Sequence, residues 1–372
     1  MFCSNCGEKV KKEDTYCSNC GAYQEEKLYE EAVSSSENKS GRFQEQVRGT
    51  FMQATEKVNR MVGEEGSIDV NLKNVFSDVF QKHTKDEAEE LFIVGTKATT
   101  PAERDISTSW PKPWLFSRVF LVLAFTFALL FIAIDTFENT NAFPGTIIIG
   151  SFAAPVSILI LFWEMNAPRN ISFYEVGKMF FIGGAAAIVA TLIIHGIFPV
   201  NDLDFTGAIT VGVVEEVAKL AIILYFIRKM NPKYILNGLL IGATIGAGFA
   251  AFESAGYAYT SAVLFGQSEM LNIIFTRGWM SVGTHVAWSA IAGAAVVYVK
   301  REQILEKDHI LQADFLKLFA VPIILHAVWD MPLGGLNTLY VLFIVLIIIA
   351  WIFILSFINA GLKQIVGLNN NQ

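Results

Sequence analysis

The chain has 372 residues, of which 53% are apolar, including 30 Phe and 7 Trp. Its formal net charge of -7 argues against a protein that binds nucleic acid through a basic patch, so no nucleic-acid partner is expected. Charge is concentrated at one end, because residues 1–110 hold 14 Lys and Arg and 20 Asp and Glu. The remainder contains repeated apolar runs of roughly 18 to 22 residues, the length that a helix needs to cross a bilayer. The composition predicts a soluble, acidic first part followed by a polytopic membrane protein.

All four cysteines lie within the first twenty residues. Cys3, Cys6, Cys17 and Cys20 follow the pattern C-x2-C-x10-C-x2-C, with a glycine after each pair. Two such pairs can supply four thiolates in a tetrahedron around Zn2+. Because so short a segment has almost no core, metal binding must provide most of its folding free energy. We predict a structural Zn2+ site in a zinc ribbon over residues 1–22, which resembles the small ribbons at the start of bacterial membrane proteins.

A disulfide pair and a redox or iron site are the alternative interpretations of these cysteines. The first residues are polar rather than a short apolar run behind a basic start, so we expect no signal peptide and a cytosolic amino terminus. A reducing cytosol disfavours disulfides. An iron centre for electron transfer usually has a larger domain around it. Four thiolates leave no open coordination position, which argues against catalysis here.

Residues 23–110 are predicted to form a cytosolic linker or stalk with some helix. Apolar residues at near-helical spacing predict one amphipathic helix that carries Phe43, Val47, Phe51, Val58 and Val62. The first interpretation is a solvated stalk whose apolar stripes pair with each other. The second is a docking arm for a partner or for the membrane surface. We favour the first because Lys and Arg do not dominate the polar face.

Residues 111–367 are predicted to form an all-α membrane domain of about eight transmembrane helices in the lipid bilayer. Candidate spans lie near 114–137, 145–163, 175–198, 207–227, 235–258, 276–299, 314–332 and 338–360. Basic residues gather in the connections after the second, fourth and sixth spans. The positive-inside rule then places both termini in the cytosol.

Four consecutive candidate spans carry polar side chains. These are Glu215, Glu216 and Lys219 in the fourth span, Glu253 in the fifth, His285 in the sixth, and His326 and Asp330 in the seventh. At 1.5 Å per residue the expected orientation places all of them in the outer half of the bilayer, with Glu253 about 8 Å before the end of its helix. A charged residue in a spanning helix costs roughly 2.5–3.5 kcal/mol. We therefore expect these groups to converge on one hydrated cavity.

Helical spacing predicts local pairs within this set. Lys219 lies four residues after Glu215 and should neutralise it, whereas Glu216 points about 100° away. Asp330 lies one turn after His326, which lets the carboxylate orient the imidazole or join it in holding a metal or water. Glycines recur at every fourth residue of the fifth span and should let a neighbouring backbone approach closely. They are Gly238, Gly242 and Gly246.

These residues, taken in order, resemble the motifs of the PrsW family of membrane-embedded proteases, within the wider group of CAAX proteases and bacteriocin-processing enzymes. The matching positions are Glu215, Glu216 and Lys219, then F-x-x-x-E at 249–253, a lone histidine at 285, and H-x-x-x-D at 326–330. In the wider group the first motif ends in Arg and the second in His, so Lys219 and Glu253 favour the PrsW branch. The resemblance covers roughly residues 111–340.

The resemblance implies hydrolysis of a peptide bond in a membrane-anchored protein substrate, for example an anti-sigma factor or a similar regulator. Our hypothesis makes Glu216 or Glu215 the general base and His285 and His326 metal ligands or donors to the oxyanion. The remaining shell would consist of Glu253 and Asp330. Two alternatives stay open: a catalytic Zn2+ held by histidine and glutamate, and a metal-free glutamate–histidine water site that uses the same residues.

Two other classes of function are compatible with buried polar residues. A proton-coupled transporter would use buried carboxylates, but we see no obvious inverted repeat, and the polar groups gather near one surface rather than at the midplane. A non-catalytic membrane sensor or anchor would bind a partner through the ribbon. That sensor would keep its function when Glu215 or His326 is replaced and lose it when Cys3 is replaced.

Overall fold

The structure is a computed structural model that describes residues 2–3, 5–11, 16–22, 45–68, 70–333 and 340–370. The chain forms two compact units, Met1–Ala54 and Thr55–Gln372. A helix occupies residues 45–61. Among the described residues there is no β-strand, only an isolated bridge between Phe2 and Lys9. The predicted all-α fold class is confirmed. The predicted division into domains at residues 22 and 110 stays a prediction.

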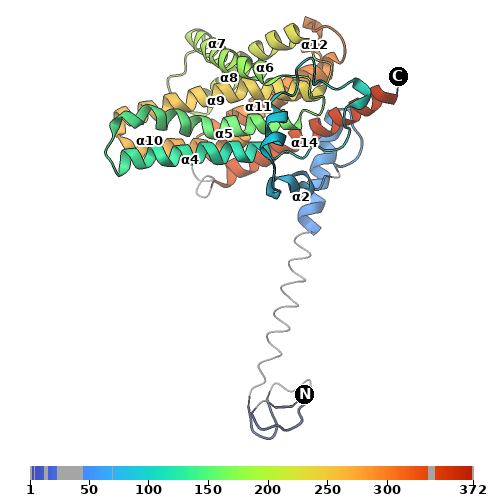
Figure 1. Cartoon of the computed structure of the whole chain (residues 1–372), viewed down its shortest axis with the longest axis vertical. Coiled ribbons are helices and arrows are strands. Elements are labelled where there is room, and N and C mark those ends of the chain that lie inside the picture. The colour runs from blue at the N-terminus through green and yellow to red at the C-terminus, as the bar shows by residue number, and fades with distance from the viewer. Residues whose placement is uncertain are drawn as a thin grey trace. The chain divides into compact units, whose positions relative to one another are not determined.

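The second unit is a bundle of long helices, in which α4, α5, α9 and α11 lie side by side (Figure 1). Four short helices precede the bundle: α2 (Leu72–Val75), η1 (Ser77–Phe80), α3 (Lys85–Phe92) and η2 (Glu103–Asp105). The first half of the bundle contains α4 (Leu115–Asp135), η3 (Thr140–Ala142), α5 (Phe143–Met165), α6 (Phe173–Lys178), η4 (Met179–Gly183), α7 (Gly184–Ile197) and α8 (Phe205–Met230). The second half contains α9 (Ile235–Phe265), α10 (Gln267–Met280), η5 (Ser281–Gly283), α11 (His285–Lys300), α12 (Lys307–Leu311), α13 (Ala313–Asp330) and α14 (Val341–Asn370).

Six helical stretches of the described chain are long and apolar enough to cross a membrane. They are Leu115–Asp135, Thr140–Met165, Phe173–Ile197, Ile235–Phe265, Gln267–Lys300 and Val341–Asn370. The expected count of eight is therefore not confirmed. The other two expected spans correspond to α8 and α13, whose central or terminal turns carry three or more charged residues each. Both helices nevertheless pack against α11, inside the bundle.

The centre of the bundle is α9, which is almost entirely buried. Its three predicted small positions all face α11: a Cβ on Gly238 would meet the Gly293 carbonyl, and one on Gly242 or Gly246 would meet the backbone oxygen of Ser289 or His285. The backbones of α9 and α11 therefore approach closely, as the glycine spacing predicted. This contact fixes His285 at a short distance from the middle of α9.

Two of the six spans are interrupted. A π-helical turn, η4, separates α6 from α7, and the 3-10 turn η5 separates α10 from α11. The second break makes His285 the first residue of α11, after Thr284 in a non-helical conformation (φ -106°, ψ -132°). The Val282 carbonyl in this break accepts a hydrogen bond from Trp351 Nε1 at 2.8 Å. The positive end of the α11 dipole thus faces the carboxylates around His285.

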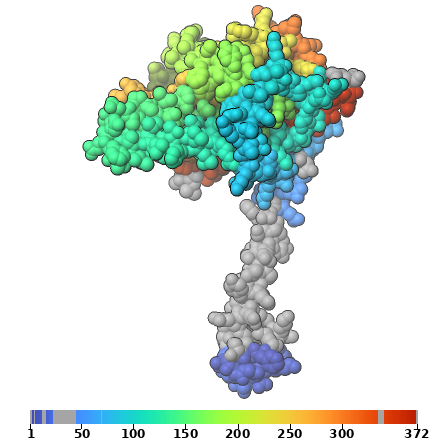
Figure 2. Space-filling view, in the orientation of Figure 1, coloured from blue at the N-terminus to red at the C-terminus, as the bar shows by residue number. Residues whose placement is uncertain are grey.

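The segment before α4 packs on the helices, and Figure 2 shows it in cyan against their surface. Val62, Val75 and Ile106 are buried in the same core as the membrane helices. Lys233 Nζ contacts Glu103 Oε1 at 2.5 Å. Partial burial disfavours the charged amine, but its hydrogen bond to Glu103 outweighs that effect and raises the pKa of Lys233. Of the predicted amphipathic stripe, Phe43 lies outside the described residues.

Candidate functional site

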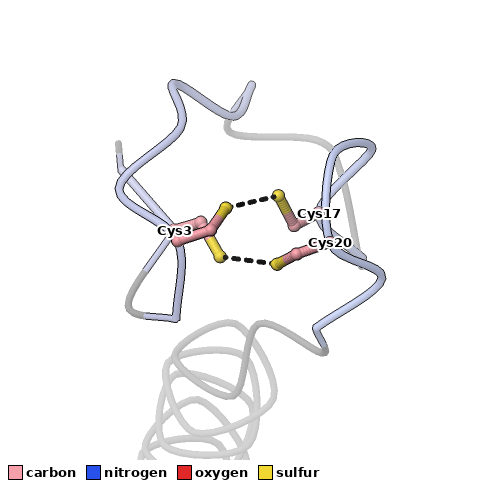
Figure 3. Close-up of side chains that lie close together, drawn as sticks. Cys3, Cys17 and Cys20 are labelled. Carbon is pink, nitrogen blue, oxygen red and sulfur yellow. Dashed lines mark hydrogen bonds between the residues drawn. The ribbon is translucent and has the colours of Figure 1, made fainter.

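The ribbon brings its four cysteines together (Figure 3). Cys3 Sγ lies 3.5 Å from Cys20 Sγ, and Cys6 Sγ lies 3.6 Å from Cys17 Sγ. No disulfide joins the four cysteines, and their sulfurs all lie within 4.8 Å of one another. A backbone hydrogen bond with Ala22, and then the neighbouring side chains, lower the pKa of the Cys20 thiol. This arrangement fits four thiolates around a structural zinc ion, as predicted.

Each pair of cysteines is held by a tight turn. The Gly7 amide donates to the Cys3 carbonyl at 2.9 Å, and the Gly21 amide donates to the Cys17 carbonyl at 2.8 Å. Both glycines have left-handed backbones, with φ of 72° and 69°. Only glycine adopts this conformation without strain, which explains why a glycine follows each C-x2-C pair.

The second site lies inside the helical unit and opens on a cavity of about 840 Å³. Side chains of α7, α8, α9, α10 and α13 line this cavity. Its polar lining includes Glu215, Glu253, Arg277, His326 and Asp330. Its apolar wall includes Leu192, Phe249 and Phe252. A volume of several hundred Å³ with few polar groups is typical of a ligand site.

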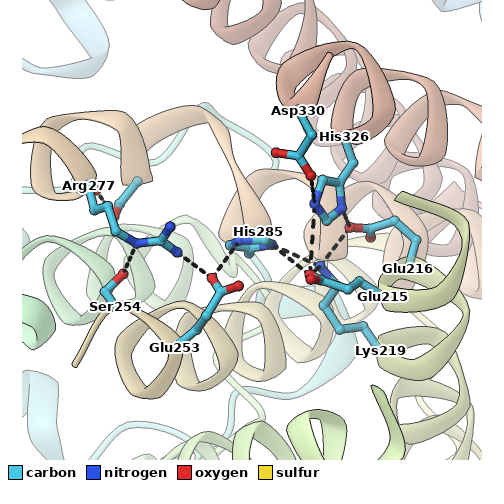
Figure 4. A network of polar contacts seen from close by, with 10 residues as sticks. Glu215, Glu216, Lys219, Glu253, Ser254, Arg277, His285, His326 and Asp330 are labelled. Atoms are coloured by element: carbon cyan, nitrogen blue, oxygen red, sulfur yellow. Dashed lines mark hydrogen bonds and ion pairs between the residues drawn. The ribbon is translucent and has the colours of Figure 1, made fainter. Parts of the chain in front are cut away.

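The structure brings together all six residues predicted from sequence (Figure 4). Glu215 and Glu216 come from α8, Glu253 from α9, His285 from α11, and His326 and Asp330 from α13. The residues at the centre of the site are buried. Each of them is less than 9% exposed: Glu215, Glu216, Lys219, His285 and His326. We call these seven residues, the predicted six and Lys219, the polar cluster.

Glu216 is the fully enclosed carboxylate of the polar cluster. Its Oε1 atom lies 2.6 Å from Lys219 Nζ and 2.8 Å from His326 Nδ1. Lys219 is 3.7 Å from Glu215 Oε2. The expected pair of Lys219 with Glu215 is thus present, but the contact of Lys219 with Glu216 is shorter and was not expected. The flexible Lys219 stem lets the ammonium reach the carboxylate one turn away at i-3, where burial demands a partner.

Lys219 of α8 also contacts residues of α11 and α9. Its ammonium donates to His285 Nδ1 at 2.9 Å and lies over the Phe249 ring, 4.5 Å from the centroid. The aromatic face thus contributes a cation–π contact.

The hydrogen bonds determine which imidazole nitrogens carry protons. The carboxylate of Glu216 faces Nδ1 of His326, so that nitrogen donates. An ammonium faces Nδ1 of His285, so this nitrogen accepts, and Nε2 donates to Glu253 Oε2 at 3.0 Å. His326 Nε2 lies 3.4 Å from Asp330 Oδ2, so this ring has a carboxylate near each nitrogen, whereas His285 has a carboxylate on one nitrogen and an ammonium on the other.

Glu215 lies near one nitrogen of each ring. Its Oε2 atom lies 3.8 Å from His326 Nε2 and 3.9 Å from His285 Nδ1. The Oε2 atoms of Glu215 and Glu216 both lack a hydrogen-bond partner among the described residues. The two glutamates differ in access, because Glu215 lines the cavity and Glu216 does not. Glu216 and Glu253 hold the two imidazoles.

This donor set fits a zinc ion. One oxygen of Glu215 and one nitrogen each of His285 and His326 lie within 4.8 Å of one another. Two imidazoles and a carboxylate are typical zinc ligands, and carboxylates on the far nitrogens are typical of the shell around them. The Lys219 ammonium already lies against two of these donors, so the position attracts a cation.

Sequence reasoning missed one charged member of the site. Arg277, near the end of α10, pairs with Glu253, and its Nε donates to Ser254 Oγ at 2.9 Å. The sequence placed Arg277 near the start of the sixth candidate span, 276–299, and gave it no role in the site. In the structure α10 begins earlier, at Gln267, and ends before the 3-10 turn η5.

The predicted depth of Glu253 is also wrong. The expected end of its helix near residue 258 is replaced by a continuous α9 that runs to Phe265. Glu253 therefore lies twelve residues, or about 18 Å, before the end of α9. Tyr257, Tyr259 and Phe265 extend this helix because aromatic and small residues continue the apolar pattern past Glu253.

The fold and the site define a multi-pass membrane protein with a buried cluster of glutamates and histidines and a separate zinc ribbon. Residues 174–356 match the family model described as PrsW family intramembrane metalloprotease, and residues 2–23 match that of a zinc-ribbon domain. The first match covers just under half of the chain, and it confirms the resemblance inferred from the motifs. Comparison with the curated proteins and with the solved structures gave no match.

The matching family is described as one of intramembrane metalloproteases, which supports a protease at the level of the family. The description of the family as metalloproteases also agrees with the zinc-compatible donors. The transporter and the anchor, the two other classes considered from the sequence, find no support in this match.

Proposed function

We propose that the protein is an intramembrane endopeptidase whose active site is the polar cluster, with Glu215 as the general base. The observation that supports this role is the difference between the two adjacent glutamates. Glu215 lines the cavity, whereas Glu216 does not line it, is 1% exposed and holds Lys219 and His326 through its Oε1 atom. A base must reach the proton that it abstracts. Glu215 can do so and Glu216 cannot.

In this proposal, the cavity admits an extended stretch of a membrane-anchored substrate and one water. Glu215 takes a proton from the water as its oxygen attacks the scissile carbonyl carbon, and later gives the proton to the leaving amine. His326, held by Glu216 and Asp330, stands where it can donate to the oxyanion. If Glu215, His285 and His326 hold zinc, the ion supplies Lewis-acid polarisation and a more acidic bound water.

The side of the membrane belongs to the proposal as well. Basic residues gather where α8 ends and where α11 ends, at Arg228, Lys229, Lys233, Lys300 and Arg301. By the positive-inside rule this end of the bundle is cytosolic, together with both termini. The polar cluster would then lie toward the extracytoplasmic side. Protease protection of tags at the two termini in right-side-out vesicles tests this orientation, and digestion of either tag would contradict it.

The test of the activity compares membrane-protein fragments by mass spectrometry. Cells express the wild-type chain, Glu215→Gln, or the matched control Glu175→Gln, whose carboxylate pairs with Lys178 outside the cavity. New peptide termini should appear with the wild type and the control and be absent with Glu215→Gln. The same termini in all three samples would refute the protease function of this site. An anti-sigma factor or a similar regulator is the substrate class to look for first.

A further inference from the structure

Arg277 is the charged residue of the cavity wall that the motifs do not include. It lies in the last turn of α10, a helix that contributes no other charged side chain to the cavity. Its guanidinium pairs with Glu253, donates from Nε to Ser254 Oγ at 2.9 Å, and stacks over the Tyr257 ring at 4.5 Å. Three contacts from one turn of α9 thus hold the planar group in one orientation.

The pair with Arg277 determines what Glu253 can do. The same oxygen, Oε2, accepts from Arg277 Nη2 and from His285 Nε2. A carboxylate buried among apolar helices needs such a counter-charge. Glu253 is therefore occupied on both sides, and it links the guanidinium to the imidazole, as Figure 4 shows.

The link extends to the proposed base. Because Glu253 accepts the hydrogen bond from His285 Nε2, the other nitrogen of this ring carries an electron pair, which accepts from Lys219 Nζ at 2.9 Å and lies 3.9 Å from Glu215 Oε2. Without Arg277, the Glu253 side chain would lose its anchor to α10. His285 could then rotate or adopt the other tautomer, which would place a proton toward Glu215.

We infer that Arg277 is a positioning residue of the protease: through Glu253 it fixes the orientation and tautomer of His285 relative to Glu215. This inference rests on the proposed function. The alternative is a purely structural link between α9 and α10, which would contribute to stability and leave the chemistry alone. The two differ in what happens to turnover when the protein remains folded.

The test uses full-length protein in liposomes and a membrane-anchored substrate identified from the fragments described above. Loss of a carboxylate or guanidinium that orients a site histidine typically costs 10–100-fold in activity, so Arg277→Ala should lower kcat by about that factor with KM within about twofold. Arg277→Lys should retain an intermediate kcat, since a lysine supplies the charge without the planar fork. Guanidinium at low, non-denaturing concentration should restore part of the kcat of Arg277→Ala, because the cavity beside the residue can admit it.

Two controls separate the possible failures. Arg228→Ala removes an exposed arginine at the other end of α8 and should leave kcat unchanged. Arg277→Ala combined with Glu253→Gln should lower kcat no more than Glu253→Gln alone if the two residues act through the same contacts.

The inference is overturned by an Arg277→Ala enzyme with wild-type kcat. It is also overturned if the loss of kcat parallels a loss in the unfolding midpoint and guanidinium does not restore it. If Glu215→Gln is also fully active, the proposed function itself fails; if only the Arg277 variants are active, the positioning role alone fails.

Discussion

The ribbon and the polar cluster each gather side chains that suit zinc, but they do so by opposite means. The ribbon takes four thiols from residues 17 positions apart at most, in two glycine turns with almost no core. The polar cluster takes carboxylates and imidazoles from four helices. Some of these residues, such as Glu216 and His326, are more than a hundred positions apart in the sequence. The cysteines of the ribbon lie close together because they are close in the sequence, whereas the side chains of the polar cluster are brought together by the packing of helices.

The comparison teaches where the stability of each site comes from. Among its described residues the ribbon has three buried apolar residues, two of them cysteines, so a bound ion must hold it together. The polar cluster is surrounded by a large core, and Lys219 and Arg277 supply counter-charges to Glu216 and Glu253. The ribbon should therefore depend on metal for its fold, and the cluster should not.

Removal of the ribbon zinc should have the largest effect on folding. Structural zinc contributes about 10–16 kcal/mol in small zinc modules, so Cys17→Ser should unfold residues 2–22 while the helical unit keeps its unfolding midpoint. Limited proteolysis would detect the first change and thermal unfolding in detergent the second. A ribbon that stays resistant to protease without metal would remove the contrast between the two sites.

The zinc content per chain sharpens the same comparison. If the polar cluster holds a catalytic ion, elemental analysis should give two zinc ions per wild-type chain and one for both Cys17→Ser and His326→Ala. One zinc in the wild type and none in Cys17→Ser would mean that the cluster works without a metal.

Within the polar cluster, the two adjacent glutamates should differ in their contribution to stability. Breaking a buried ion pair from one side costs about 3–5 kcal/mol, and Glu216 serves both Lys219 and His326. Glu216→Gln should lower the unfolding midpoint markedly, whereas Glu215→Gln should lower it little. Equal shifts for the two variants would contradict the division of roles between a structural and a reactive carboxylate.

Substitutions at the contact between α9 and α11 should have the next largest effect on the unfolding midpoint. A side chain at Gly242 would press on the backbone at Ser289, and forced packing costs about 1–3 kcal/mol. Gly242→Val should reduce both the unfolding midpoint and the cleavage rate, because it displaces His285 from Glu253. Gly256→Ala in the same helix meets nothing within 4 Å and should keep the midpoint of the wild type.

The smallest effect is expected outside the core. Lys233 is 34% exposed in its pair with Glu103, and pairs this accessible contribute at most about 1 kcal/mol. Glu103→Gln should change the unfolding midpoint only slightly, and the difference from wild type should shrink further at high salt. A large shift would mean that the segment before α4 is a major part of the stability of the helical unit.

The sequence predicted the members of both sites and part of their internal pairing. The spacing of Cys3 to Cys20 and the order of the motifs on consecutive helices were sufficient to find the ligands and the polar cluster. The expected pairs of Lys219 with Glu215 and of His326 with Asp330 are present. The shorter contacts of Glu216 with Lys219 and His326 were not expected, because the contact with His326 depends on how α8 packs against α13.

Arg277 and the length of α9 were missed for a different reason. The apolar pattern does not locate the 3-10 turn between α10 and α11. The sequence did predict helices at α8 and α13, but their charges keep both out of the six stretches that are apolar enough to cross a membrane. The charges that lower the apolar signal are those that form the site. Regions of functional interest are thus where predictions of spans from hydropathy are least accurate.

The most direct measurement is the initial rate at which liposome-reconstituted Glu215→Gln cleaves an identified membrane-anchored substrate, beside wild type and Glu175→Gln. The loss of a general base typically costs 10²–10⁴-fold. We predict a loss of at least about 100-fold for Glu215→Gln with the unfolding midpoint of the wild type, and no loss for Glu175→Gln. A Glu215→Gln enzyme within about twofold of the wild-type rate would contradict the assignment of the polar cluster as the active site.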